Sequence, residues 1–300
     1  VGPNYAMREE LKHCPVCEAT SFEKVVGTVD YSTSKEAFTV QKCTVCSHLF
    51  TNPRVVEAEI GPYYDNPNYI SHTNENKSLF GQVYQVLRGV NLRRKLSYVN
   101  AVHRGQGTVL DYGCGTGQFL ETLVQSGKNA VGVEINDNAR AAAQSFGSVS
   151  ASIEGVEKGV EVITMWHVLE HIYDLNGLLS SFKERLLPGG HLIIAVPNPE
   201  SHDAEHYGKY WAAWDVPIHA HHFTEASVSK LLGNHGFDLQ KVIPMNMDSY
   251  YISLLSEQYK SGTESKTLGH WIKALYRGFV SNLKAGKTNT SSKIYVFKLG

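Results

Sequence analysis

The sequence predicts an α/β fold in which helices cover both faces of a doubly wound parallel sheet, with a small metal-binding domain ahead of it. Three observations support this prediction. From Thr108 onward, short apolar segments alternate with helix-length segments, and parallel strands need such long crossovers. The first of these apolar segments runs into a glycine-rich loop, Gly113 to Gly117. Ahead of it, four of the 5 cysteines form two C-x-x-C pairs.

Composition limits the classes of partner. The chain has 300 residues, 42% of them hydrophobic, so it can bury one large core and a small appendage. Lys and Arg number 28 against 29 Asp and Glu, which leaves no bulk basic charge to attract nucleic acid or a membrane, and we expect neither as a partner. Since no apolar run approaches a membrane span and no signal-peptide pattern opens the chain, we expect a cytoplasmic protein.

The cysteine pairs predict a zinc ribbon over residues 1–52. Each C-x-x-C places two thiolates on one tight turn, and four thiolates form the tetrahedral set that zinc prefers. Phe22–Val29 and Ala37–Gln41 between the pairs are rich in β-formers. Two disulfides or redox dithiols are the alternative, but a cytoplasmic location disfavours disulfides and no thioredoxin-like βαβ pattern surrounds either pair. The expected ligands are Cys14, Cys17, Cys43 and Cys46.

Residues 53–104 read as a linker and a helical cap, because apolar residues recur at the helical period over Leu79–Val102. Residues 105–300 form the large domain, with a turn at Pro188-Gly189-Gly190. Strands are expected at Val109–Asp111, Ala130–Glu134, Val149–Ile153, Val160–Trp166, His191–Val196, Phe237–Val242 and Ser292–Leu299. Helices are expected at Gln118–Ser126, Asn138–Ser145, Asn176–Leu187, Glu225–Gly233 and Trp271–Leu283. The last of these helices packs either on its own domain or in a homodimer contact.

The glycine loop indicates a ligand other than a dinucleotide. A dinucleotide-binding loop would carry its third glycine or an alanine at position 118, where this chain has Gln118. The spacing here is G-x-G-x-G, preceded by Asp111. The next apolar segment ends in Glu134, whose two carboxylate oxygens can accept both hydroxyls of a ribose.

Two motifs of this chain resemble motifs of a known family. Asp111 and the loop resemble motif I of class I S-adenosylmethionine (SAM) methyltransferases, and Trp166-His-Val-Leu-Glu-His171 resembles a segment of the group that includes ubiquinone-biosynthesis O-methyltransferases. The resemblance spans Thr108 to about Thr224 and implies a Rossmann-like SAM-binding domain. It implies cofactor contacts from Asp111, Gly113, Cys114, Gly115, Glu134, Ile135, Ile153, Trp166 and His167. Core packing is the alternative role for Trp166. In related enzymes the segment before the first strand covers the methionine end of SAM, so Tyr69 and His72 are candidates there, with surface packing as the alternative.

Five of the 14 histidines fall within Ser201–Phe223, a stretch that we expect to be a loop lining the acceptor pocket. Two chemical routes fit. In the first, a histidine removes the proton of an acceptor hydroxyl. In the second, Glu170, His171 and a later histidine bind a divalent metal, as in small-RNA 2′-O-methyltransferases, although His167 stands where those enzymes have a glutamate. The metal-free route is favoured, and the catalytic candidates are Glu170, His171, His219 and His222.

The leading hypothesis is therefore a SAM-dependent methyltransferase acting on a hydroxyl of a small-molecule or sugar-type acceptor. A ribbon ahead of such a domain also resembles bacterial sugar C-methyltransferases, which makes C-methylation of a sugar nucleotide an alternative. A zinc-ribbon module that binds RNA or protein beside an inactive Rossmann-like domain is a second alternative. A third, an NAD-dependent oxidoreductase, conflicts with Gln118.

Overall fold

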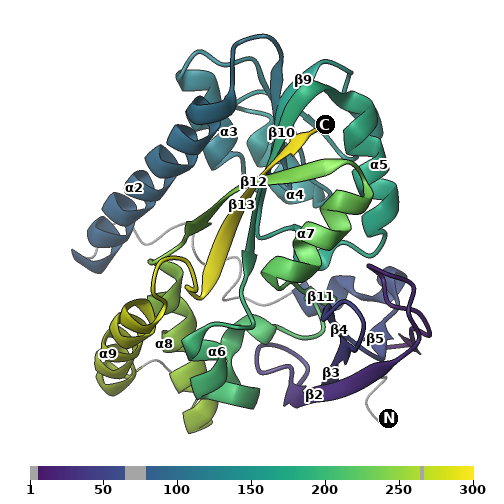
Figure 1. The fold of residues 1–300 in the computed structure, drawn as a ribbon. Coiled ribbons are helices and arrows are strands. Elements are labelled where there is room, and N and C mark those ends of the chain that lie inside the picture. The colour runs from purple at the N-terminus through teal and green to yellow at the C-terminus, as the bar shows by residue number, and fades with distance from the viewer. Residues whose placement is uncertain (1–5, 65–78, 264–266) are drawn as a thin grey trace.

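A seven-stranded sheet forms the centre of the protein in a computed structural model that describes residues 6–64, 79–263 and 267–300 (Figure 1). The strand order is β12-β13-β10-β9-β6-β7-β8. Neighbours from β8 to β10 are parallel, whereas β13 is antiparallel to both β10 and β12, so the sheet is mixed rather than wholly parallel as expected. The bounds are β6 Thr108–Tyr112, β7 Ala130–Val133, β8 Ser148–Ser150, β9 Val160–Trp166, β10 Leu186–Pro197, β12 Phe237–Pro244 and β13 Ser292–Leu299.

Helices cover both faces of this sheet, which confirms the doubly wound arrangement (Figure 1). Successive residues of a strand point to opposite faces. Val109 therefore shares a core with α2 and α3, while its neighbour Leu110 shares another with α5 and α7. The covering helices are α2 Leu79–Val102, α3 Gln118–Gln125, α4 Asp137–Ala143, α5 Leu175–Arg185 and α7 Glu225–Asn234.

The expected strands and helices agree with the structure to within a few residues, but the expected turn at residues 188–190 does not. Pro188-Gly189-Gly190, predicted as a turn, lies inside β10. The pairing of β10 with β9 shifts register between Leu186 and His191, and Gly189 has a left-handed φ of 73° there. The segment therefore forms an irregular part of the strand.

The cysteine-rich segment folds into a four-stranded sheet of order β11-β4-β3-β2. Three strands come from the N-terminal region: β2 Phe22–Val29, β3 Ala37–Cys43 and β4 Leu49–Thr51. The fourth, β11 His221–His222, comes from the histidine-rich stretch and pairs with Phe50 and Leu49. The expectation that this stretch is all loop is therefore wrong at β11, because its backbone completes the edge of the ribbon. The short β1 Arg8–Glu9 pairs with β5 Arg54–Val55, and the 3-10 helices η1 Glu57–Glu59 and η2 Gly61–Tyr64 follow.

A helical layer lies below the sheet in Figure 1. The loop expectation also fails at α6 His202–Tyr207, whose N-terminus is capped by Ser201. The predicted helix at Trp271–Leu283 is α9 Leu268–Lys284. Its partner α8 Asp248–Ser261 had not been expected, since the buried residues include Ser249, Ser253 and Ser256 rather than an apolar stripe. Four 3-10 turns complete the described fold: η4 Ile153–Gly155, η5 Leu169–His171, η6 Gly208–Tyr210 and η7 Ala212–Trp214.

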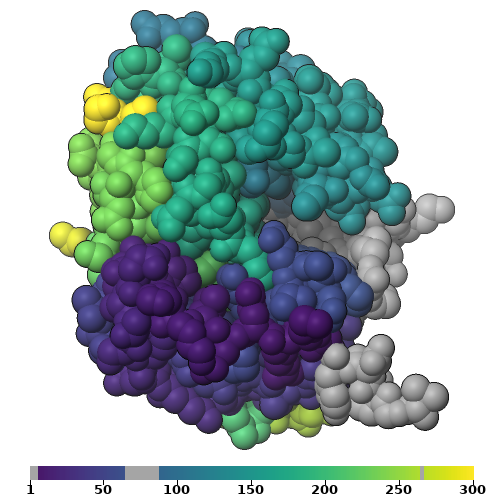
Figure 2. Space-filling model, turned by 90° about the vertical axis from the view of Figure 1, so that its right-hand side faces the viewer, coloured from purple at the N-terminus to yellow at the C-terminus, as the bar shows by residue number. Residues whose placement is uncertain are grey.

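The N-terminal region packs directly against the rest of the chain. Figure 2 shows the purple and blue N-terminal residues below the teal residues from the middle of the chain, with the surface hollowed between them. The carboxyl ends of β6 and β9 meet where the strand order reverses, which is the usual ligand position in such sheets. Among the described helices, none has the length and apolar character needed to cross a bilayer.

Candidate functional site

The glycine loop after β6 makes a tight turn at this reversal point. Gly113, Gly115 and Gly117 all have positive φ angles, of 74°, 55° and 84°. A Cβ on Gly113 would lie 2.5 Å from Cγ2 of Val168, and one on Gly117 would lie 2.8 Å from Cα of Ala143. Glycine is therefore required at these two positions by backbone conformation and by space.

Glu134, at the end of the next strand, binds the loop directly. Its Oε2 accepts a hydrogen bond from the Gly115 N–H at 2.8 Å, and its Oε1 accepts one from the Asn136 N–H at 2.9 Å. Both carboxylate oxygens thus lie beside the loop, where a ribose would be held. Its role in SAM binding stays a prediction.

Asp111 lies beneath the loop rather than on its surface. Its carboxylate is buried and accepts a 2.7 Å hydrogen bond from the Thr164 hydroxyl on β9. Burial raises the pKa of Asp111 to about 6, against the opposing effects of Thr164 and Lys95. This hydrogen bond joins strands β6 and β9, and a contact of Asp111 with SAM stays a prediction.

The other predicted cofactor residues differ in accessibility. Cys114 is buried against Gly132, where an added Cβ would lie 2.7 Å from its Sγ. Ile135 is 85% exposed beside Glu134, whereas the Ile153 side chain lies in the apolar core. Of the two isoleucines, only Ile135 has a side chain placed to cover a ligand from the solvent side.

Trp166 and His167 end strand β9. Trp166 packs edge-to-face on Phe119 with ring centres 5.6 Å apart, and Nζ of Lys95 lies 4.6 Å from the centre of its ring. Trp166 is half-buried, so both of its proposed roles remain open. His167 has a φ of 58°, a strained backbone conformation of the kind that concentrates at functional sites.

The His167 imidazole lies between two carboxylates. Its Nε2 is 3.1 Å from Oδ2 of Asp248, and its Nδ1 is 3.4 Å from Oε1 of Glu170. Burial alone would lower the pKa of His167, but Asp248 and Glu170 outweigh it and raise this pKa to about 10. At neutral pH His167 is therefore a cation, which excludes it as a general base.

Glu170, His171 and His219 form a second group. Their candidate ligand atoms lie within 4.8 Å of one another. Nδ1 of His171 lies 3.0 Å from the Ile218 carbonyl and Nδ1 of His219 lies 3.0 Å from the Ala213 carbonyl. Because a carbonyl only accepts, both Nδ1 atoms carry hydrogen and both Nε2 atoms keep their lone pairs. Burial lowers the pKa of both histidines, so both are neutral.

Glu170 is the member of this group whose buried polar atoms receive the least hydrogen bonding. Its side chain is 1% exposed, and neither carboxylate oxygen has a hydrogen-bond partner among the residues that the structure describes. A buried carboxylate in this state needs a cation or a proton donor. The charged His167 supplies one cation at 3.4 Å. A divalent metal fits the same place, since one carboxylate and two neutral imidazoles form a suitable donor set.

His222 lies outside this group. It pairs with Leu49 in the ribbon sheet, its Nε2 is 3.2 Å from the Thr51 hydroxyl, and its ring packs on Trp214. Thr51 also donates a 2.8 Å hydrogen bond to the carbonyl of His219. The structure therefore places His222 between the ribbon and the catalytic candidates, and its catalytic role stays a prediction.

The four cysteines of the ribbon come together as predicted. Sγ of Cys14 is 3.5 Å from Sγ of Cys46, and Sγ of Cys17 is 3.6 Å from Sγ of Cys43. Thiolates around one zinc at about 2.3 Å stand roughly 3.8 Å apart, so this cluster fits structural zinc. None of the four forms a disulfide.

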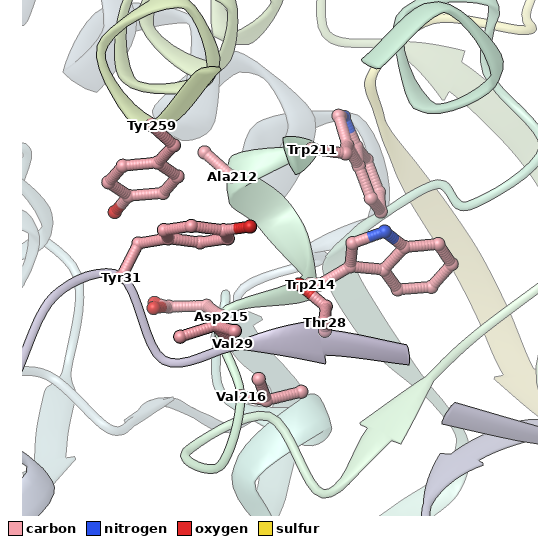
Figure 3. Close-up of a pocket in the computed structure, with 9 residues that line it drawn as sticks. All are labelled: Thr28, Val29, Tyr31, Trp211, Ala212, Trp214, Asp215, Val216 and Tyr259. Carbon is pink, nitrogen blue, oxygen red and sulfur yellow. The ribbon is translucent and has the colours of Figure 1, made fainter. Parts of the chain in front are cut away.

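A small cavity lies between the ribbon and the helical layer (Figure 3). Tyr31 stacks on Tyr259 across it, and Trp211, Trp214 and Asp215 line it from the histidine-rich stretch. Its volume of about 10 Å³ is the space of one water molecule. In this arrangement the cavity is too small to admit an acceptor.

Three residues in the site were not predicted from sequence. Asp248 begins α8 and contacts His167, Lys95 of α2 lies over Trp166, and the hydroxyl of Tyr64 is 3.1 Å from Nδ1 of His171. Only Tyr64 had a local signal, as part of a Tyr-rich linker. The candidates Tyr69 and His72 lie outside the described residues.

Comparison with known proteins agrees with this geometry. A family profile described as a methyltransferase domain matches residues 84–242. The ubiquinone biosynthesis O-methyltransferase of Nitrosospira multiformis is 25% identical over 171 residues, which is 51% of this chain and 72% of that protein. The demethylmenaquinone methyltransferase of Tropheryma whipplei is 26% identical over 142 residues, 41% of this chain and 59% of that protein. The solved StiE O-MT segment has a TM-score of 0.50 at 16% identity and covers 75% of this chain and 78% of its own, a similarity of fold.

Proposed function

This chain belongs to the methyltransferase-domain family and is a SAM-dependent methyltransferase, and from that premise we propose that it methylates a hydroxyl oxygen of a small-molecule or sugar-type acceptor. Bound SAM supplies an electrophilic methyl group on a positively charged sulfur. The protein has to hold that group at the glycine loop, bring an oxygen into line with it and accept the hydroxyl proton.

The observation that carries the proposal is the state of His171 and His219. Both are neutral, and each fixes its Nδ1–H on a backbone carbonyl. Each therefore keeps a basic Nε2, and one ring nitrogen of each histidine lies within 4.8 Å of a Glu170 carboxylate oxygen. An acceptor hydroxyl placed beside Glu170 donates its proton to one of these Nε2 atoms as its oxygen attacks the methyl carbon, while the bond from that carbon to sulfur breaks. The resulting imidazolium is stabilised by the neighbouring carboxylate of Glu170.

His167 has a different role in this scheme. As a cation, it places a positive charge 3.4 Å from the buried Glu170 carboxylate. The His167 cation already lies beside the carboxylate oxygen that a metal ion would have to bind. This favours the metal-free route.

Metal-assisted methylation at the same group is the second candidate, because Glu170, His171 and His219 offer one carboxylate and two imidazole donors. A divalent ion there would lower the pKa of an acceptor hydroxyl directly. Titration with Mn²⁺ followed by electron paramagnetic resonance separates the two routes. Binding in the wild type that disappears in His219→Gln supports the metal route.

The function is tested by incubating the zinc-loaded protein with methyl-labelled SAM and a panel of phenols, catechols, sugars and sugar nucleotides. We expect a labelled O-methyl product, and a loss in His219→Gln of about 10²-fold or more in kcat with SAM affinity kept. Glu184→Gln, an exposed change on α5, is the control. A product methylated only at carbon would reject the hydroxyl proposal in favour of C-methylation.

A further inference from the structure

Helix α9 exposes a continuous apolar stripe. Six of its large apolar side chains are more than half exposed, and they recur every three or four residues, so they lie on one face. They are Leu268 at 75%, Ile272 at 60%, Leu275 at 58%, Tyr276 at 61%, Phe279 at 53% and Leu283 at 67% exposure. A contiguous exposed patch of this kind marks an interaction site.

The orientation of α9 is fixed by its opposite face. That face is built of small buried residues, including Ala274 and Gly278. A Cβ on Gly278 would lie 2.6 Å from Cδ1 of Tyr250 on α8, and Ser281 donates a 2.9 Å hydrogen bond to Asp203. A rotation that buried the stripe would force large side chains into this contact. The stripe is therefore exposed because α9 packs on α8 through its small residues.

Charge indicates the partner. Helix α9 contains Lys273, Arg277 and Lys284 and no acidic residue. At 100° per residue these three cations fall on one flank of the helix, beside the apolar stripe. Nζ of Lys273 lies 4.0 Å from Oε2 of Glu257 on α8. The helix carries local positive charge in a chain whose net charge is −1.

We propose that the α9 stripe docks on an anionic lipid surface, with the helix lying in the plane of the interface. Apolar residues on one side and lysine and arginine on the flank are the pattern of interfacial helices. An antiparallel pairing with a second copy of α9 would bring two basic flanks together, whereas anionic headgroups complement them. The net charge of the chain suggested no membrane partner, because an average over all residues conceals a basic segment.

Co-sedimentation of the full zinc-loaded chain with lipid vesicles tests the proposal. We expect binding to vesicles that contain phosphatidylglycerol in phosphatidylcholine, and much weaker binding to phosphatidylcholine alone or at high salt. Leu275→Glu with Phe279→Glu should weaken binding at least about tenfold. Lys273→Gln and Lys284→Gln should each weaken it about fivefold.

The matched control is Val124→Glu, an exposed apolar residue of α3 away from the stripe, and it should bind as the wild type does. Circular dichroism and zinc content show whether each variant is folded. The proposal fails if the wild type does not sediment with anionic vesicles, or if the stripe variant still does. It also fails if light scattering shows a wild-type dimer that the stripe variant converts to a monomer, since the stripe would then be an interface between copies.

Discussion

Replacing Asp248 by asparagine should lower the pKa of His167 by about one pH unit from its value near 10. The two charges are 3.1 Å apart, which corresponds to about 1 kcal/mol in water and about 5 kcal/mol at an effective dielectric constant near 20. The His167 side chain is 37% exposed, so solvent screening places the interaction near the lower figure. One pH unit corresponds to about 1.4 kcal/mol.

The same change gives stability a defined pH dependence. The pKa of His167 is raised in the folded protein, so its stabilising effect is complete below the usual histidine value of 6.5 and is lost as the pH rises through about 10. The pKa of Asp248 is lowered, despite burial, mainly by its hydrogen bond to His167, so its own contribution disappears only in acid, as the pH falls through that lowered pKa. The free energy of unfolding should therefore differ between wild type and Asp248→Asn by a constant amount from weakly acidic pH up to about pH 9, and should converge above pH 10.

The assay is a pH titration of the ¹⁵N-labelled imidazole of His167, paired with urea unfolding at several pH values. Asp238→Asn, an exposed change on β12, is the matched control and should alter neither result. An unchanged titration midpoint in Asp248→Asn would refute the assignment of His167 as a cation held by two carboxylates. A stability difference that persisted above pH 10 would mean that Asp248 acts by packing rather than by charge.

Three further perturbations test other parts of the fold. Glu134→Ala should reduce SAM affinity at least about tenfold, measured by isothermal titration, while zinc content stays the same; unchanged affinity would mean that the ribose lies elsewhere. Gly113→Ala should cost about 1–3 kcal/mol in the free energy of unfolding, because its φ is 74° and its Cβ would meet Val168 at 2.5 Å. Combining Gly113→Ala with Val168→Ala should recover only part of that loss, because the second change removes the steric contact but not the unfavourable φ. Full recovery would show that backbone strain contributes nothing to the loss. Removing zinc with a chelator should lower the melting temperature and perturb the His219 imidazole resonance. The reason is that Thr51 of the ribbon donates a hydrogen bond to the His219 carbonyl. An unchanged resonance would mean that the ribbon does not position His219.

Local sequence signals located most of the fold. The strands Val160–Trp166 and Ser292–Leu299 have the predicted bounds, since each is a continuous apolar or alternating segment. Helix α8 was missed because serines rather than apolar residues occupy much of its buried face. The antiparallel direction of β13 was missed because direction within a sheet depends on how the chain returns, and α8 and α9 lie in that return.

Features whose chemistry lies in neighbouring residues could be predicted from the amino-acid sequence. The G-x-G-x-G turn, the acidic end of the next strand, the two C-x-x-C pairs and Glu170-His171 all depend on spacing of a few positions. The distant groups that complete these features are seen only in the folded chain. Asp248 reaches His167 from a helix that begins 81 positions later, and Thr51 of the ribbon holds the carbonyl of His219. The physical reason is that a pKa or a hydrogen bond depends on separation in space, and long loops and crossovers bring such groups together without a periodic signal in the sequence.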